Sequence, residues 1–325
     1  MNLLVTGGCG FIGSNFINYY FHTNTDCRII NIDALYYCAN ILNVSEDIRN
    51  SNRYTLIPVN LTDEKYYLKD ILLSFNIDHV IHFAAQSHVQ TSFSDSLQYT
   101  KDNILGTHML LEACRVYGKI KRFIHISTDE VYGESMISKA EHKKTEESIL
   151  CPTNPYAATK ASAELIAQSY YHSFKMPIII TRGNNVYGPN QYPEKLIPYF
   201  IQCLKAGKKV PIQGNGENLR AFIHVNDVCS GLQIILDHGK VGEIYNIGSD
   251  DDSELSVLEV AKFLINKICF LNTNTLDNDY DHWIEYVEDR PFNDKRYFIS
   301  NEKLKNLSWE IKVSFKEGIS SLLKL

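Results

Sequence analysis

The sequence predicts an α/β fold, in which a doubly wound parallel sheet is followed by a smaller, interlaced C-terminal α/β domain. Over the first half of the chain, short apolar runs alternate with longer amphipathic stretches, which is typical of parallel strands joined by crossover helices. A glycine-rich turn follows the first apolar run, and the alternation ends near residue 182. The 325 residues suffice for one large domain or two interlocked ones.

The first part of the chain contains the expected elements in regular order. Apolar runs predict strands at Leu3–Val5, Arg28–Asp33, Tyr54–Val59, His79–Phe83, Arg122–Ile126 and Pro177–Thr181. Helical spacing of apolar residues predicts helices at Phe11–Phe21, Asp63–Phe75, Asp95–Tyr117 and Tyr156–Phe174. Because helices separate the strands, both faces of the sheet are expected to be covered.

The turn between the first strand and the first helix reads Gly7-Gly8-Cys9-Gly10-Phe11-Ile12-Gly13. Glycines let the backbone approach a pyrophosphate, and the helix N-terminus presents free N–H groups to it. Asp33 ends the second strand, where a carboxylate accepts hydrogen bonds from adenosine ribose hydroxyls and repels a 2′-phosphate. A glycine-rich turn can also be an ordinary loop, but this context predicts a Rossmann-type fold that binds NAD in preference to NADP.

Beyond Arg182 the pattern changes. Asn, Gly and Pro cluster over Gly183–Pro193, and the later helices are expected to be short. We therefore predict a dinucleotide-binding domain at residues 1–182, to which a strand near 241–247 returns, and a substrate-binding domain at residues 183–325. The boundary between the two domains is expected to be interlaced.

Composition and charge exclude several classes of protein. Hydrophobic residues are 44% and charged residues 22% of the chain, and the net charge is −6, whereas a general nucleic-acid binder is normally basic. No apolar run is long enough for a transmembrane helix, and the N-terminus lacks the features of a signal peptide. Eight cysteines without a CxxC pair favour a reducing compartment over a disulfide framework or a metal site. We therefore expect a cytoplasmic protein without a membrane, nucleic-acid or metal partner.

Tyr156 and Lys160 lie four residues apart at the start of an expected helix, and therefore on one face of it. A tyrosine ordinarily titrates near about 10 and is a poor base at neutral pH. A nearby ammonium and a positive nicotinamide ring would favour the phenolate. This spacing also arises by chance on many helices, so its weight comes from its combination with the glycine-rich turn.

Asp129 and Glu130 are adjacent acids that follow the fifth strand, directly after Thr128. Two close carboxylates disfavour double ionisation, and burial raises the pKa of both. One can then stay protonated as a general acid while the other acts as a base. For an arbitrary pair of acids, a solvated turn is the simpler interpretation.

These motifs together resemble the extended short-chain dehydrogenase/reductase superfamily over nearly the whole chain. Thr6–Gly13 is similar to its cofactor loop, Phe83–Ala85 to the end of its fourth strand, and Asn103–Thr107 to the next helix. Tyr156 and Lys160 are similar to its catalytic pair, and Thr128 corresponds to the hydroxyl residue that completes the triad. Cys9, where such loops often carry Ala, departs from the pattern.

Ile126–Gly133 resembles the nucleotide-diphosphate-sugar 4,6-dehydratases within this superfamily. Asn184–Pro198 and Asp289–Tyr297 are more similar to the UDP-glucose 4,6-dehydratase module of plant-type rhamnose synthases than to bacterial dTDP-glucose enzymes. Gln86 differs from the Glu that the bacterial enzymes tend to have. The reductase/epimerase half of the plant enzymes is expected to be absent.

The resemblance implies a lyase that converts a nucleotide-diphosphate glucose to its 4-keto-6-deoxy derivative with NAD, with UDP-glucose favoured and dTDP-glucose as the alternative. Tyr156 would take the proton of the 4-hydroxyl, Glu130 the C5 proton, and Asp129 would protonate the departing 6-hydroxyl. A 4-epimerase or decarboxylase on the same scaffold, and a catalytically inactive NAD-binding interaction module, are the other functions considered.

The expected site residues form three sets. The catalytic set is Thr128, Asp129, Glu130, Tyr156 and Lys160. The cofactor-binding set is Gly7, Gly10, Phe11, Ile12, Gly13, Asp33, Asn60, Leu61, Ala84, Ala85, Tyr156 and Lys160. The substrate-binding set is Ser87, Thr128, Asn185, Lys195, Leu196, Arg220, Asn246, Arg290 and Tyr297. The resemblance also implies a homodimer formed through the helices at Asp95–Tyr117 and Tyr156–Phe174, while His88 and His224 are expected to be structural or to lie beside the substrate.

Overall fold

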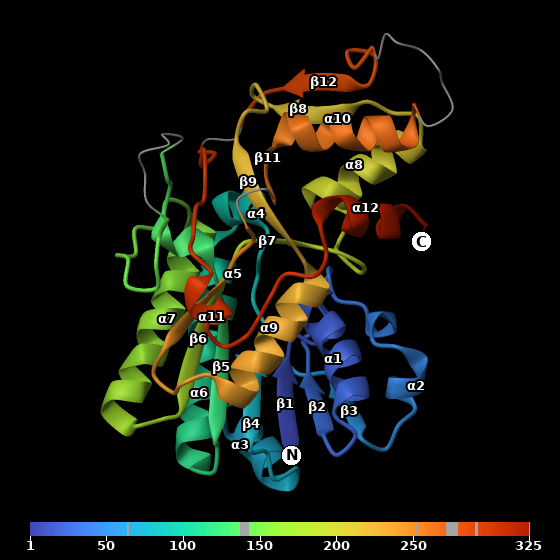
Figure 1. Ribbon diagram of the computed structural model, residues 1–325. Coiled ribbons are helices and arrows are strands. Elements are labelled where there is room, and N and C mark those ends of the chain that lie inside the picture. Colours follow the sequence, from blue (N-terminus) through green and yellow to red (C-terminus); the bar gives the residue numbers. More distant parts are fainter. Residues whose placement is uncertain (64, 137–142, 251–252, 271–278, 290–291, 325) are drawn as a thin grey trace.

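The main sheet of this computed structural model has seven strands in the order β10-β6-β5-β4-β1-β2-β3, and all of its pairings are parallel. The structure describes residues 1–63, 65–136, 143–250, 253–270, 279–289 and 292–324. The strands are β1 (Asn2–Thr6), β2 (Arg28–Ile32), β3 (Tyr54–Ile57), β4 (His79–His82), β5 (Arg122–Thr128), β6 (Ile178–Gly183) and β10 (Ile244–Ile247). The predicted Rossmann-type α/β fold is confirmed, and β10 is the strand that returns to the sheet (Figure 1).

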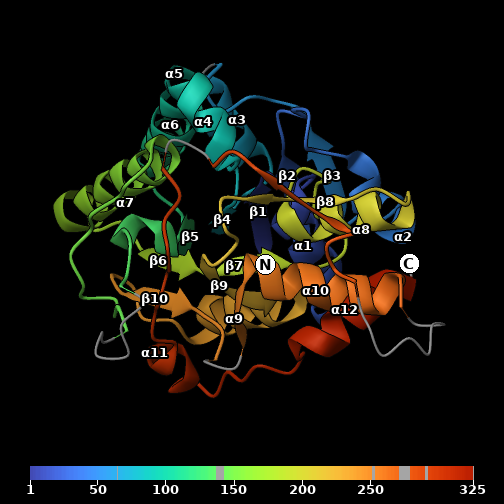
Figure 2. The same cartoon turned by 90° about the horizontal axis from the view of Figure 1, so that it is seen from above.

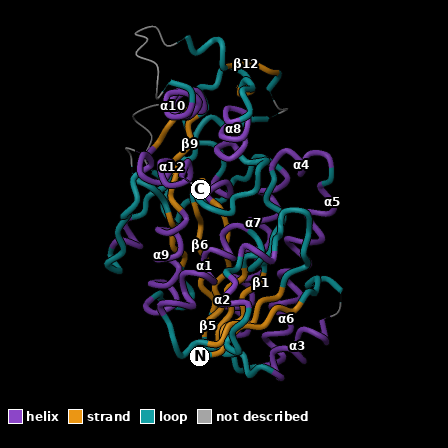
Figure 3. The backbone as a smooth tube through the Cα atoms, turned by 90° about the vertical axis from the view of Figure 1, so that its right-hand side faces the viewer, coloured by secondary structure: helices purple, strands orange, loops and turns teal. Residues whose placement is uncertain are grey.

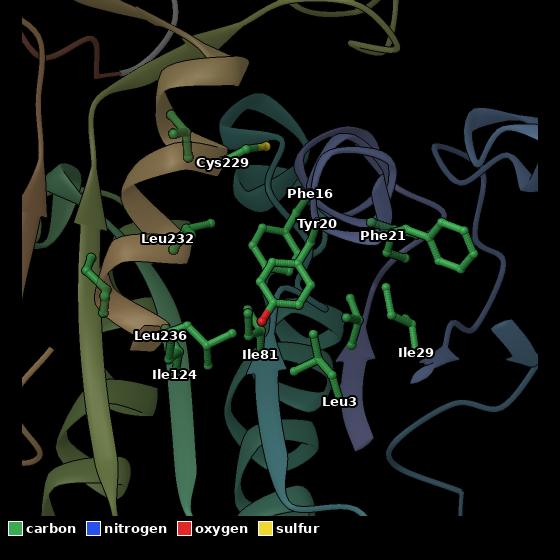
Figure 4. Packing of buried hydrophobic residues seen from close by; sticks show 14 of the residues in the cluster. Leu3, Phe16, Tyr20, Phe21, Ile29, Ile81, Ile124, Cys229, Leu232 and Leu236 are labelled. Carbon is green, nitrogen blue, oxygen red and sulfur yellow. The ribbon is translucent and has the colours of Figure 1, made fainter. Parts of the chain in front are cut away.

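Helices cover both faces of this sheet (Figure 2). One face packs against α3 (Lys65–Ser74), α6 (Gly106–Tyr117) and α7 (Pro155–Phe174), and the other against α1 (Phe11–Thr23) and α9 (Val225–His238). Figure 4 shows Phe16 and Tyr20 of α1 beside Leu232 of α9, over Ile81 of the sheet. Burying such a side chain stabilises the fold by ~1.5–3 kcal/mol.

The helix predicted at Asp95–Tyr117 is divided into α5 (Ser96–Tyr99), a π-helical turn η2 (Thr100–Leu105) and α6. The wide turn contains Asn103, whose buried amide donates hydrogen bonds to Gln86 O and Thr159 Oγ1. Such local widening of a helix often accompanies a special side-chain position, and apolar periodicity alone does not reveal it.

The expectation that the helices after Arg182 are short is wrong for α9, which has 14 residues. Its apolar face, with Val228, Cys229, Leu232 and Leu236, belongs to the core under the main sheet. The second part of the chain therefore supplies both a strand and a covering helix to the sheet, because α1 alone does not cover that face.

The remaining elements lie mainly beyond the carboxyl ends of the main strands (Figures 1 and 3). One small sheet has the order β11-β9-β7, and β12 pairs with β8. The strands are β7 (Asn185–Tyr187), β8 (Val210–Gln213), β9 (Leu219–His224), β11 (Glu254–Ser256) and β12 (Ile284–Val287). The helices are α8 (Leu196–Lys205), α10 (Val257–Ile268), α11 (Glu302–Lys305) and α12 (Phe315–Lys324). Short segments nearer the sheet are η1 (Ile41–Asn43), α2 (Glu46–Arg49), α4 (Val89–Ser94) and η3 (Asp129–Tyr132).

Candidate active site

Two adjoining cavities lie where the main strands end. The first is lined by every residue of the predicted cofactor-binding set: Gly7, Gly10, Phe11, Ile12, Gly13, Asp33, Asn60, Leu61, Ala84, Ala85, Tyr156 and Lys160. The second is lined by Thr128, Asp129, Glu130, Asn185 and Leu196. Both cavities share Ile126, Ser127 and Tyr156, and also Ser87 and Lys195, so a group in the first can reach a group in the second at Tyr156.

The glycine-rich turn between β1 and α1 leaves no room for side chains on the floor of the first cavity. Gly7 has φ +71°, and a Cβ on it would lie 2.7 Å from the Ala84 backbone nitrogen. A Cβ on Gly13 would lie 2.4 Å from the Gly7 carbonyl oxygen. The first turn of α1 therefore stays open to the cavity, as the pyrophosphate of a dinucleotide requires.

Asp33 is buried at the end of β2, on the wall of the same cavity. Its two carboxylate oxygens accept hydrogen bonds from the backbone N–H groups of Cys9 and Leu35, each at 2.8 Å. Burial raises the pKa of Asp33, and these two N–H groups oppose that rise. The oriented carboxylate retains lone pairs for ribose hydroxyls, so the cavity fits the adenosine half of NAD.

The adjacent acids lie in η3, directly after β5. The Thr128 hydroxyl accepts a hydrogen bond from Glu130 N at 3.3 Å and donates one to Asp129 Oδ1 at 3.2 Å. Asn184 donates to the other oxygen of Asp129 at 2.6 Å, and Asn154 donates to Glu130 Oε2 at 2.9 Å. The two carboxyl groups therefore have separate partners, although they are neighbours in sequence.

The two acids also differ in their electrostatic surroundings. Burial, and then the charge of Glu130, raise the pKa of Asp129 to about 7, against the opposing effect of Asn184. Burial raises the pKa of Glu130 as well, while Asn154 and the positive charges of Arg220 and Lys195 oppose that rise. The predicted rise of both pKa values is present, and the surroundings favour Asp129 as the acid and Glu130 as the base.

Tyr156 lies in the first turn of α7, which Asn154 caps by accepting a hydrogen bond from Ala157 N at 2.9 Å. Lys160 follows one turn later, and its ammonium donates to Ile126 O at 2.6 Å. Burial lowers the pKa of Lys160 to about 8.

The groups of the protein by themselves favour the neutral phenol of Tyr156, so the combined effect of Lys160 and a nicotinamide ring on the phenolate stays a prediction. Burial, and then the charge of Glu130, raise the pKa of Tyr156, whereas the nearby Thr128 hydroxyl lowers it. The ammonium of Lys160 is directed at the end of β5 instead. Formation of the phenolate therefore depends on a further positive charge next to Tyr156, and a nicotinamide ring in the adjoining cavity would provide one.

The structure places the predicted substrate-binding residues in different surroundings. Lys195 donates to Ser87 O at 2.8 Å, within the wall shared by the two cavities. The Arg220 guanidinium stands over the Tyr297 ring at 5.3 Å, and the Tyr297 hydroxyl lies 3.4 Å from Glu130 Oε2. Arg220 and Tyr297 therefore lie on the side of Glu130 away from the second cavity, and neither of them lines that cavity. Arg290 lies outside the described residues.

The prediction that Asn246 contacts the substrate requires correction. Asn246 is completely buried within β10, where its side-chain oxygen accepts a hydrogen bond from Tyr132 OH at 2.8 Å and its amide donates to Lys144 O. It does not line either cavity, because β10 is at the edge of the sheet, beyond β6. The role of Asn246 is to hold the segment before α7 against the sheet.

His88 and His224 both form hydrogen bonds or close contacts within short structural segments. His224 caps α9 by accepting a hydrogen bond from Asn226 N at 3.2 Å, and His88 lies 2.7 Å from Thr91 Oγ1 in α4. Among the described residues, no cluster of His, Cys, Asp or Glu has the arrangement of a metal site. No helix in the described part of the chain combines the length and apolar character needed to cross a membrane.

Sequence reasoning missed three polar residues at the acids: Asn154, Asn184 and Asp294. Asn154 immediately precedes Pro155, and Asn before Pro is a recognisable helix start, so this residue could have been found. Asn184 directly follows the last residue of β6, and Thr128 is the last residue of β5. Because these neighbouring strands are parallel, their carboxyl ends lie side by side. Asp294 lies within the motif Asp289–Tyr297, but nothing local in that motif indicates that its loop returns to β5.

The fold, with Tyr156 at the junction of the two cavities and Lys160 in the first of them, places the chain in the extended short-chain dehydrogenase/reductase class. The family described as GDP-mannose 4,6 dehydratase matches residues 4–322. The chain belongs to this family of nucleotide-sugar 4,6-dehydratases, which confirms the predicted resemblance.

Several relatives are enzymes of known activity. The chain is 43% identical over 323 residues to a trifunctional UDP-glucose 4,6-dehydratase/UDP-4-keto-6-deoxy-D-glucose 3,5-epimerase/UDP-4-keto-L-rhamnose-reductase of Arabidopsis thaliana, covering 99% of this chain and 46% of the relative. It therefore spans about half the length of that relative. It is 44% identical over 351 residues to a dTDP-D-glucose 4,6-dehydratase of Dictyostelium discoideum, covering 98% of this chain and 79% of the relative.

Solved structures agree with this family assignment. A dTDP-glucose 4,6-dehydratase of Streptomyces venezuelae with NAD bound has a TM-score of 0.90 and 34% identity, covering 100% of this chain and 96% of that chain. A UDP-glucose 4-epimerase of Thermotoga maritima has a TM-score of 0.87 and 28% identity, covering 100% of this chain and 98% of that chain. NAD is the cofactor of the dehydratase family, in agreement with the predicted cofactor.

Proposed function

We propose that this chain is an NAD-dependent nucleotide-diphosphate-glucose 4,6-dehydratase that prefers UDP-glucose to dTDP-glucose. The observation that carries the proposal is the Asp129–Glu130 pair, with pKa values raised by burial, next to Tyr156 where the two cavities meet. NAD in the first cavity would accept hydrogen with its electron pair from sugar C4 and later deliver it to C6. Asp33 and the turn from Gly7 to Gly13 would hold it.

The residues of the chain perform the proton transfers. Tyr156 takes the proton of the sugar 4-hydroxyl, and the resulting 4-ketone acidifies the C5 hydrogen. Glu130 removes that C5 proton while Asp129 protonates the departing 6-hydroxyl, so that water leaves. As C6 then receives the hydrogen with its electron pair, Glu130 gives a proton back to C5, which completes the 4-keto-6-deoxy product and leaves Glu130 ionised. Each positioned acid or base contributes about 10²–10⁴-fold to the rate.

One such cycle leaves an extra proton on Tyr156 and removes one from Asp129. The Thr128 hydroxyl is hydrogen-bonded to Asp129 Oδ1 at 3.2 Å, and Thr128 is close enough to Tyr156 to lower the pKa of its phenol. It therefore connects the residue that gains a proton with the residue that loses one. Because Thr128 both donates and accepts hydrogen bonds, it can return the proton from Tyr156 to Asp129 and so restore the site.

The charged and polar groups at the second cavity suit a nucleotide diphosphate. Lys195 and Asn185 line the cavity, and Arg220 adds positive charge behind the acids. The similarity of Asn184–Pro198 to plant-type enzymes supports UDP-glucose, and the dTDP-glucose enzyme of Dictyostelium discoideum is equally similar overall. The nucleotide preference therefore rests on those local motifs.

The experiment is to assay the purified protein with UDP-glucose and with dTDP-glucose in parallel. The expected product has lost one water by mass and shows the absorbance of a 4-keto sugar in base, and kcat/KM is higher for UDP-glucose. Glu130→Gln should abolish this product and leave the bound cofactor reduced. A product of unchanged mass, epimeric at C4, would instead indicate the epimerase function, and NAD binding without turnover would indicate an inactive module.

The homodimer belongs to the same proposal. Five apolar side chains on α5, α6, α7 and η2 are exposed in the single chain: Leu97, Leu105, Val116, Leu165 and Phe174. A second copy that packs the same helices against them would remove this surface from water. Light scattering should give twice the mass of the chain, and a monomer at micromolar concentration would contradict the dimer.

A further inference from the structure

Asp294 is a third buried carboxylate close to the acids, and the steps described above do not use it. It is 4% exposed. The Thr153 hydroxyl donates to Asp294 Oδ1 at 2.6 Å, and the Tyr297 hydroxyl donates to the other oxygen, Oδ2. Thr153 directly precedes Asn154, which binds Glu130, so Asp294 is joined to the catalytic segment from two sides.

The Tyr297 hydroxyl stands between two carboxyl groups. It is bonded to Asp294 Oδ2 and lies 3.4 Å from Glu130 Oε2. A phenol has a single hydrogen to donate, and the closer partner, Asp294, receives it. The contact with Glu130 therefore becomes a good hydrogen bond only when Glu130 itself carries a proton and donates it to the phenol oxygen.

We propose that Asp294 is a positioning residue of the dehydration, which accepts through Tyr297 the proton that Glu130 removes from C5. The inference rests on the proposed function. The O–H bond of Glu130 breaks as a new O–H bond forms on Tyr297, and the former Tyr297 hydrogen moves to Asp294 Oδ2. One proton is transferred, no electrons change hands, and Glu130 returns to its ionised form. After the proton on Asp294 has exchanged with water, the reverse transfers bring a proton back to Glu130, which delivers it to C5 as C6 receives its hydrogen.

The surrounding charges are consistent with this route. The charge of Asp294 adds to burial in raising the pKa of Glu130, and Arg220 over the Tyr297 ring opposes it. Burial, and then the charges of Glu130 and Asp294, raise the pKa of Tyr297. The Tyr297 phenol therefore stays protonated. It gives its proton to Asp294 only when it receives a proton from Glu130. Thr153 is half-buried and leads from Asp294 toward the surface.

The test follows deuterium placed at C5 of the sugar nucleotide that the wild-type protein dehydrates, in ordinary water. In the wild type, the proton on Glu130 exchanges through Asp294, so the product contains hydrogen from water at C5. In Asp294→Asn the deuteron stays on Glu130 and returns to C5, so most of the label is retained. Because Glu130 then returns the deuteron itself, kcat and KM should stay near the wild-type values, and the label at C5 is the readout.

Tyr297→Phe provides an independent variant, since it removes the bridge and leaves the Asp294–Thr153 hydrogen bond. It should retain the label as Asp294→Asn does, whatever its KM. The control is Asp237→Asn, which removes an exposed carboxylate on α9 and should lose the label as the wild type does. If Asp294→Asn or Tyr297→Phe makes product that loses the label to the wild-type extent, the route through Asp294 is wrong. If the wild type itself forms no dehydrated product, the proposed function fails instead.

Discussion

Asp129 and Glu130 are covalent neighbours, yet they face different partners. Asp129 is 2% exposed, and within the described part of the chain its carboxyl group receives hydrogen bonds from two neutral donors, Thr128 and Asn184. Arg220 lowers the pKa of both acids, but Glu130 is also affected by the positive charge of Lys195, and Asn154 donates a hydrogen bond to it. Because neutral donors stabilise a carboxylate less than nearby cations do, the same backbone turn provides both an acid and a base.

This difference predicts a bell-shaped dependence of kcat/KM on pH. Activity requires an ionised Glu130, so it falls as pH decreases through the raised pKa of that residue. It also requires a protonated Asp129, so it falls as pH rises above about 7. Asn184→Ala should move the alkaline limb to higher pH, because the lost hydrogen bond had lowered the pKa of Asp129. If the alkaline limb of Asn184→Ala lies at the same pH as that of the wild type, a group other than Asp129 causes the limb.

The same burial predicts that Asp129 reduces stability at neutral and alkaline pH. Its folded pKa of about 7 exceeds its ordinary value of 3.8, so ionisation costs free energy in the folded state. This cost is absent below about pH 4 and complete above about pH 7. Asp129→Asn should therefore increase the free energy of unfolding by a few kcal/mol at pH 8, with a smaller gain near pH 5, while dehydration is lost. Urea unfolding at both pH values measures this, and an equal gain at both would contradict the ionisation argument.

At the scale of elements, the approach of α1 to the glycine-rich turn determines whether NAD can bind. A Cβ on Gly13 would lie 2.4 Å from the Gly7 carbonyl oxygen, and that backbone atom cannot move alone. Gly13→Ala should destabilise the fold by about 1–3 kcal/mol and weaken NAD binding more than 10-fold by calorimetry. Gly106→Ala in α6 is the matched control, because its Cβ would meet nothing closer than 3.6 Å. That variant should be as stable as the wild type or gain up to about 1 kcal/mol; equal NAD affinity in both variants would contradict the role of the turn.

Across the whole molecule, α9 makes the second part of the chain contribute to the core of the first. Leu232 is completely buried there, in the same cluster as Leu3, Ile81 and Ile124 of the sheet. Leu232→Ala should lower the free energy of unfolding by about 2–5 kcal/mol in one cooperative transition. Leu73→Ala, at an exposed position of α3, should change it by less than about 0.5 kcal/mol. Two separate transitions for Leu232→Ala, with NAD binding lost only in the second, would show that the two parts unfold independently.

The sequence by itself determined the order of strands and helices up to residue 182, the glycine-rich turn and the position of the proposed catalytic residues within short motifs. These features depend on local periodicity and on residues a few positions apart, such as Tyr156 and Lys160 on one helical turn. Only the tertiary structure decided that α9 covers the main sheet, that Asn246 is structural, that Asn184 contacts Asp129 and that Asp294 is linked to Glu130 through Tyr297. Asp129 and Asn184 are 55 positions apart, and Tyr297 and Glu130 are 167 apart. Such contacts arise from chain crossings and long-range burial, which no local pattern encodes.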